Sequence, residues 1–212
     1  LAGLGAEKPE TKLLMGINNL DAKLTALNTR MSALFDIAAK RVTVAVRWSD
    51  IDAAVGDIAT KEQEINTFLS MTSQLDYPEY EKDALNTVLL GAATKLAGLC
   101  KAADYQVIGS STPLRTDVIE SVAQGSFGNL DDIAAMGIYL SNNILRAKSA
   151  YSQLFFIAEY GRLQKGESDF GSTEVIAAKG LQHTMPFDAL ADACTRRTAE
   201  VMLKYGQTSE QL

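Results

Sequence analysis

The residue types that most often carry out chemistry in proteins are sparse in this sequence. His183 is the only histidine, and Cys100 and Cys194 are the only cysteines. Structural zinc sites use four Cys or His ligands, and dinuclear iron sites in helical bundles need Glu-x-x-His motifs on two helices. The chain can satisfy neither pattern, so we expect no metal site and no cofactor.

The sequence also lacks the motifs of a catalytic serine and of a phosphate-binding loop. A nucleophilic serine needs a neighbouring base and, in α/β-hydrolases, a GxSxG turn between a strand and a helix. Gly109-Ser110-Ser111 does not fit that turn, and nothing in the sequence links it to His183. Gly125-Ser126-Phe127-Gly128 lacks the lysine of a phosphate-binding loop and is typical of a turn. The sequence therefore favours a protein that is not an enzyme.

Carboxylates occur in closely spaced pairs at three places: Glu62/Glu64, Glu79/Glu81 and Asp131/Asp132. The second and third pairs stand where helices are expected to begin, and the positive end of a helix dipole favours acidic residues there. Glu62 instead falls on an apolar seam. We expect it to end the tight packing, to pair with Lys61 or Lys95, or to set the helix register.

Two interpretations of the cysteines stay open. Cys100 and Cys194 both lie in helical patterns with apolar neighbours, which is typical of buried free thiols. A disulfide between them would instead close a loop of about 95 residues and contribute about 4–5 kcal/mol in the chain-entropy model. Disulfides persist in oxidising compartments, so this alternative is tied to export from the cytoplasm.

An aromatic group gathers near the end of the third expected long helix: Tyr151, Phe155, Phe156, Tyr160 and Phe170. Such a group could line a ligand pocket or a contact surface. At helical spacing it is more typical of a core-facing stripe.

Apolar residues at heptad spacing predict the helices that must position these side chains. The strongest pattern proceeds in steps of four and three residues: Leu13, Ile17, Leu20, Leu24, Leu27, Met31, Leu34 and Ala38. Val42, Val44 and Val46 alternate as in a strand, but no Gly or Pro brackets them, so we interpret them as helix. We predict an all-α fold, an elongated antiparallel bundle of three or up to four helices with coiled-coil-like long helices and loop-rich ends.

The expected domain is a single bundle over residues 11–206, with a flexible N-terminus at 1–10 and a tail at 207–212. Long helices are predicted at about 11–73, 79–104 and 131–163, and a short C-terminal helix at 186–205. Two paths stay open for the first helix, which either continues unbroken through Trp48-Ser49-Asp50 or kinks there. A short helix is expected from Leu114 to Ala123. The irregular segments at 104–130 and 164–185 should lie at opposite ends of the bundle.

The charge balance restricts the partners. The net charge is −6, and the longest basic cluster is Lys40-Arg41. Binding to nucleic acids or to anionic lipids normally needs a basic face, so we expect neither. No apolar run approaches the ~20 residues of a membrane-spanning helix. We expect no span within this chain, while a lipid anchor outside it stays open.

These observations predict a non-enzymatic exported or cell-surface protein that acts through a protein partner or self-association. A surface coat protein (a surface antigen), an adhesin or a receptor ectodomain would be built in this way. In its expected architecture and size the chain resembles the helical-bundle coat proteins of trypanosomes and the pilus-tip subunits of type IV secretion systems, and this resemblance implies no residue roles. A periplasmic pilus-tip-like subunit and a cytoplasmic helical scaffold or assembly factor are the alternatives.

Overall fold

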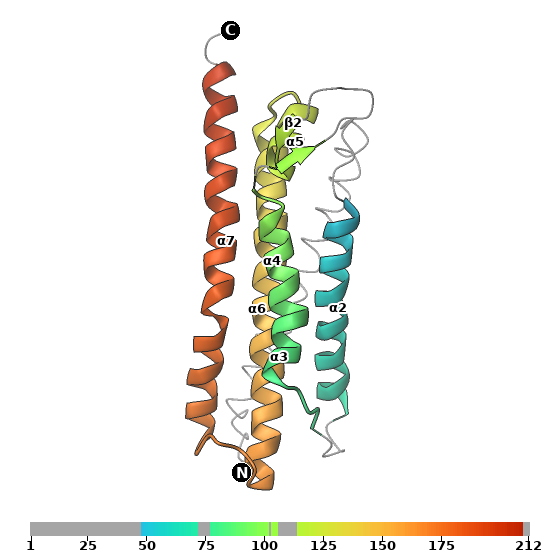
Figure 1. Cartoon of the computed structure of the whole chain (residues 1–212), viewed down its shortest axis with the longest axis vertical. Helices are drawn as coiled ribbons and strands as arrows, with labels where there is room; N and C mark the ends of the chain where they lie inside the picture. Colours follow the sequence, from blue (N-terminus) through green and yellow to red (C-terminus); the bar gives the residue numbers. More distant parts are fainter. Residues whose placement is uncertain (1–47, 72–76, 102, 106–113, 210–212) are drawn as a thin grey trace, which may run out of the picture.

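The chain forms an elongated bundle of antiparallel helices (Figure 1). This computed structural model describes residues 48–71, 77–101, 103–105 and 114–209, and the account below concerns those residues. The chain runs down α2 (Trp48–Ser70), up through α3 (Lys82–Leu85), the π-helix η1 (Asn86–Leu90) and α4 (Gly91–Gly98), down α6 (Leu130–Lys165) and up α7 (Thr173–Ser209) (Figure 1). The prediction of an elongated all-α bundle is confirmed.

Several predictions for the N-terminal part fall outside the described residues. They concern the flexible residues 1–10, the seam from Leu13 to Ala38 and the helical interpretation of residues 42–46. These stay predictions, as does the path of the first helix ahead of Trp48. From there on, α2 occupies the second part of the predicted helix, with Ile51, Ala54, Ile58 and Ile65 buried.

The helix α6 is the centre of the bundle. It packs against α2, α4, α5 (Val118–Gly125) and α7, and it buries side chains around much of its circumference. Asn129 caps its first turn by accepting hydrogen bonds from two backbone amides, and Gly166 ends it in the left-handed conformation with φ +73°. The predicted bounds of 131–163 therefore differ from the observed helix by one or two residues at each end.

The second helix begins later than predicted. Residues 77–81 form no regular secondary structure, and Pro78 lies ahead of the helix rather than in its first turn. The Tyr80 hydroxyl donates a hydrogen bond to the Glu64 carboxylate of α2, which holds this segment across α2. The helix then contains the π turn η1 and ends at Gly98, short of the predicted residue 104.

The predicted loop at 104–130 contains regular structure. The strand β1 (Ala103–Tyr105) pairs antiparallel with β2 (Leu114–Thr116), with Ala103 opposite Thr116. The short helix expected within 114–123 is therefore wrong in its first part. It begins at Val118 because the Asp117 side chain caps the backbone amide of Glu120.

The C-terminal helix is much longer than predicted. Residues 186–205 are helical as predicted, but the predicted start at 186 after an irregular segment at 164–185 is wrong, because α7 begins at Thr173 and continues through Pro186. A proline inside a helix removes a hydrogen bond and costs about 3 kcal/mol. Burial of flanking side chains offsets this cost, since Ile176 and Phe187 are both fully buried.

Small and polar residues form part of the seam by which α7 packs. Gly180, Thr184 and Thr198 alternate along it with larger apolar residues. A side-chain carbon added at Gly180 would lie 3.3 Å from Phe155 of α6, and Gly137 of α6 lies directly against Thr198. These small residues allow α6 and α7 to approach closely along their length. None of the described helices is both long enough and apolar enough to cross a membrane.

A buried ion pair joins α2 to α6. The Arg146 guanidinium donates to both carboxylate oxygens of Glu62, with Nε 2.9 Å from Oε1. Its Nη1 donates to Asn143, which is fully buried and donates in turn to the Tyr139 carbonyl oxygen. The predicted pairing of Glu62 with Lys61 or Lys95 is wrong, because the carboxylate faces α6 and Lys61 pairs with Glu64 instead.

Candidate interaction site at the end of the bundle

The predicted aromatic group does not surround one pocket. Tyr151 and Phe155 face α7, where Tyr151 packs against Phe187 with ring centroids 5.6 Å apart. Phe155 contacts Phe170 and His183 at centroid distances of 6.1 and 5.2 Å. Both side chains are buried, so this half of the group belongs to the core.

The other half of the group lies toward α2. Phe156 stacks on Tyr160 at 6.0 Å, and Tyr160 contacts Tyr77, which in turn contacts Phe68. A surface cavity of about 460 Å³ lies nearby, lined by Thr60, Gln63, Glu64, Thr67, Phe68, Met71, Pro78 and Tyr80. None of the five predicted aromatic residues lines this cavity. The five residues fall into two sets of ring contacts, and a role for them in binding stays a prediction.

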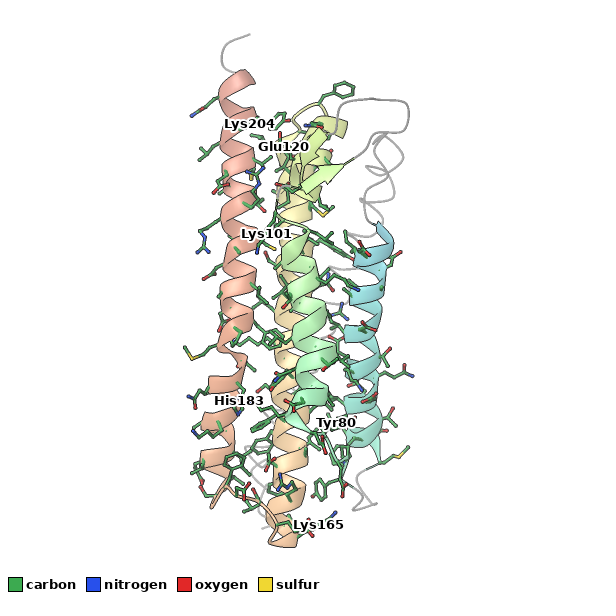
Figure 2. The ribbon with its side chains drawn as sticks, in the orientation of Figure 1. Tyr80, Lys101, Glu120, Lys165, His183 and Lys204 are labelled. Carbon is green, nitrogen blue, oxygen red and sulfur yellow. The ribbon has the colours of Figure 1, made fainter. Side chains whose placement is uncertain are left out.

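The single histidine lies on α7 beside the core (Figure 2). His183 contacts the edge of the Phe155 ring, and burial together with the charges of Lys82 and Lys179 lowers its pKa. Among the described residues, no three His, Cys, Asp or Glu side chains are grouped so that they could hold a metal ion.

The two cysteines are brought together by α4 and α7. Cys100 and Cys194 are both buried and are free thiols in the structure. A hydrogen bond between the thiols raises the pKa of Cys100, and burial raises it further. The disulfide between them stays a prediction.

Carboxylates buried under α5 tie one end of the bundle to α7. Asp117 is fully buried, and its Oδ2 accepts a hydrogen bond of 2.6 Å from Nε of Arg197. Its other oxygen caps α5 by accepting from the Glu120 amide at 2.7 Å. One aspartate thus fixes both the start of α5 and its attachment to α7.

Glu120 makes the second attachment. It is only 5% exposed, and its Oε1 accepts hydrogen bonds from Lys204 Nζ at 2.6 Å and from the Tyr205 hydroxyl at 2.9 Å. Figure 2 shows Glu120 and Lys204 near the same end of the bundle. Burial alone would raise the pKa of Glu120, but the hydrogen bonds from Lys204 and Tyr205 outweigh it and lower the pKa. The carboxylate is therefore ionised at neutral pH.

The tyrosine in this cluster provides a test of it. Burial, the hydrogen bond to Glu120 and the Glu120 charge raise the pKa of Tyr205 from 10.0 to about 12. Because the pKa of Tyr205 is raised in the folded state, its protonated hydroxyl stabilises the folded protein fully below pH 10. This contribution to the free energy of unfolding is lost as the pH rises toward 12. We expect an ultraviolet titration of tyrosine to lose one late-titrating group in Tyr205→Phe. An unchanged titration curve in that variant would contradict the hydrogen bond between Tyr205 and Glu120.

A tight turn follows α5 and projects a phenylalanine from the bundle. Phe127 has φ +56°, which is rare for a residue other than glycine, and its side chain is 96% exposed. Gly128 follows with φ +77° and donates a backbone hydrogen bond of 2.7 Å to the Ala123 carbonyl oxygen. A side-chain carbon at Gly128 would lie 2.9 Å from the Tyr205 ring, so this position requires glycine.

The turn is held on both sides. Asn129 begins α6 through its capping hydrogen bonds to the amides of Asp131 and Asp132. Leu130 is part-exposed beside Gly206 of α7. The backbone around Phe127 is therefore held in place by contacts on both sides. We call residues Ser126 to Leu130 the tip turn. Its chemistry suits insertion into an apolar pocket of another molecule and provides no catalytic group.

The sequence identified the tip turn only as a turn. Exposure of Phe127 depends on how the turn rests on Tyr205, nearly 80 residues later in the chain, and no local pattern reveals that contact. Comparisons with protein-family models, with curated proteins and with solved structures give no match.

Proposed function

We propose that this protein is a non-enzymatic, exported or cell-surface helical bundle that acts by protein–protein contact through its tip turn. The exposure of Phe127 carries the proposal. Scattered apolar residues are normal on protein surfaces. Phe127 differs from them because it is almost wholly exposed and has a backbone conformation that costs about 1–2 kcal/mol for a residue with a side chain. A feature that costs stability and leaves an aromatic ring in water is explained by binding.

The architecture around the turn supports this proposal. Aromatic side chains are common anchors of protein interfaces, and they bind best when they are held rigid before contact. The tip turn rests on Tyr205 and on the ion pairs of Asp117 and Glu120 with α7. The long bundle carries this anchor at its end, as a coat protein, an adhesin, a receptor ectodomain or a pilus-tip-like subunit would.

The charge of the tip indicates the partner's chemistry. Asp131 and Asp132 follow the turn directly, and the whole chain carries a net charge of −6. We propose a protein partner that offers an apolar pocket for Phe127 with basic side chains at its rim. Complementary charge of this kind raises the association rate and is screened by salt.

Photocrosslinking tests the proposal in the cells that make the protein. Phe127 is replaced by the photoreactive analogue p-benzoylphenylalanine, and Leu181 of α7, also well exposed, carries the same probe in a control. We expect one discrete protein adduct from position 127 and none from position 181. No adduct from position 127 would contradict the proposal.

Affinity measurements with the captured partner complete the test. We expect Phe127→Ala to weaken binding about 30-fold or more, as for a central anchor worth about 2 kcal/mol. Leu181→Ala should leave the affinity unchanged. Because the Phe127 ring is so exposed, Phe127→Ala should unfold at the wild-type temperature, which separates lost binding from lost folding. Equal affinities for wild type and Phe127→Ala would refute the role of the tip.

A further inference from the structure

One side of the central helix α6 is apolar and exposed. Ile138, Leu145 and Phe156 are 47%, 41% and 37% exposed, although most other apolar residues of α6 are buried. Their spacing in the sequence returns all three to one side of a helix with 3.6 residues per turn, and we call them the α6 stripe. The residues between them on this side are uncharged: Asn142, Ser149 and Ser152. Helix faces in contact with water normally carry charged side chains, so this side has the composition of a covered face.

The α6 stripe lies between α2 and α7. Arg146 points to Glu62 of α2, and Lys148 pairs with Asp188 of α7 at 2.7 Å. Around the helix axis, Leu145 lies between these two side chains. Figure 1 shows α4 in front of α6, with α7 and α2 on its flanks. Within the described part of the chain, three sides of α6 are thus packed against helices and the side with the stripe is exposed.

The chain contains a segment that fits this position. Residues 1–47 precede α2 and lie outside the described residues, and the apolar seam from Leu13 to Ala38 belongs to them. As a helix this seam would be about 38 Å long, and the α6 stripe extends over about 27 Å. One antiparallel register places a seam residue opposite each member of the stripe: Ala38 opposite Ile138, Met31 opposite Leu145 and Leu20 opposite Phe156.

The start of α2 lies where this segment can return to α6. The helices α2 and α6 run in the same direction (Figure 1), and the paired residues Glu62 and Arg146 each lie about four turns into their helix. Trp48 is therefore level with the first turn of α6. A straight continuation of α2 would carry the seam past the beginning of α6 and leave it in water. A reversal within residues 39–47 would bring it back, since nine extended residues reach about 30 Å and packed helix axes are about 8–10 Å apart.

We propose that residues 13–38 form a helix that runs antiparallel to α6 and packs its apolar seam on the α6 stripe, between α2 and α7. The valines at 42, 44 and 46, which alternate as in a strand, then belong to the reversal. The chain's own segment is favoured over a second copy because it is tethered beside the stripe, at an effective concentration of about millimolar. The proposal is independent of the contact function of the tip turn, because it concerns a different surface.

Photocrosslinking of the purified full chain tests the proposal. Leu145 is replaced by p-benzoylphenylalanine, and Leu203 of α7, which is 65% exposed, carries the same probe in a control. After irradiation and trypsin digestion, we expect position 145 to be joined to the peptide 24–30 or 31–40 of the same chain, in a product of monomer mass. Position 203 should not be joined to either peptide. A product of twice the monomer mass, a link to another part of the chain or no link from position 145 would overturn the proposal.

Hydrogen exchange gives a second readout on the same surface. Leu145→Lys places an ammonium group on the α6 stripe, where covering it without a partner is unfavourable. We expect amide exchange in residues 13–38 to become about tenfold faster or more, because the docked state opens more often. Leu203→Lys should leave these rates unchanged, and slow exchange in α6 and α7 of both variants would show that the bundle is folded. Equal exchange of residues 13–38 in wild type and Leu145→Lys would also overturn the proposal.

Discussion

Replacing Arg146 with methionine is expected to lower the free energy of unfolding by about 3–5 kcal/mol. Arg146 is only 7% exposed, and it satisfies both oxygens of Glu62 and the Asn143 side-chain oxygen. Methionine has a similar volume but no hydrogen-bond donor. The variant therefore leaves a carboxylate and an amide oxygen without their partner in the α2–α6 interface, and the loss of pairing dominates over any change in packing.

Chemical denaturation measures this difference. The matched control is Lys148→Met on the same helix, because Lys148 pairs with Asp188 at 2.7 Å in an ion pair that is largely exposed to solvent. Solvent screening limits such pairs to about 0–1 kcal/mol, so the control should lie close to wild type. Similar losses from Arg146→Met and Lys148→Met would contradict the importance of burial.

A double variant separates pairing from packing. Glu62→Met together with Arg146→Met removes both charges, and buried ion pairs can often be replaced by apolar residues at little cost. We expect the double variant to recover much of the stability that Arg146→Met loses. If the double variant recovered no stability, packing of the aliphatic part of the Arg146 side chain, rather than the ion pair, would hold α2 against α6.

Local patterns predict the helices whose buried faces are apolar. Ile133, Leu140, Ala147 and Leu154 of α6 stand at heptad spacing and are all buried, so both the helix and its facing side follow from sequence. The same reasoning fails for the first part of α7. That part contains Gly180 and Thr184, which are typical of loops, although both are buried in the bundle.

Tertiary contacts decide what the sequence leaves open. Glu62 finds its partner 84 residues away on α6, so a search among neighbouring lysines could not identify Arg146. The tip turn behaves in the same way, because Gly128 lies against Tyr205 of α7, and no local pattern reveals that contact.

Substituting Gly137 with alanine should destabilise the protein by about 2–3 kcal/mol through overpacking of α6 against α7. A side-chain carbon at this position would lie 2.7 Å from Cβ of Thr198, which is closer than two carbon atoms can approach. Thr198 is branched at that carbon and also donates a hydrogen bond of 2.8 Å to the Cys194 carbonyl oxygen, so it cannot rotate away. The helices must separate instead, and the loss should extend along their interface.

Gly56→Ala on α2 is the matched control, because nothing lies within 4 Å of the added carbon. Alanine is favoured over glycine inside a helix, so this control should gain about 0.5–1 kcal/mol in denaturant unfolding. The combination of Gly137→Ala with Thr198→Gly removes the Thr198 atoms that the added carbon would meet and should recover part of the loss. A stabilising Gly137→Ala would mean that α6 and α7 are farther apart than the structure places them. Opposite signs for the same substitution on two helices would show that the close approach of α6 and α7, rather than helix propensity, governs stability at Gly137.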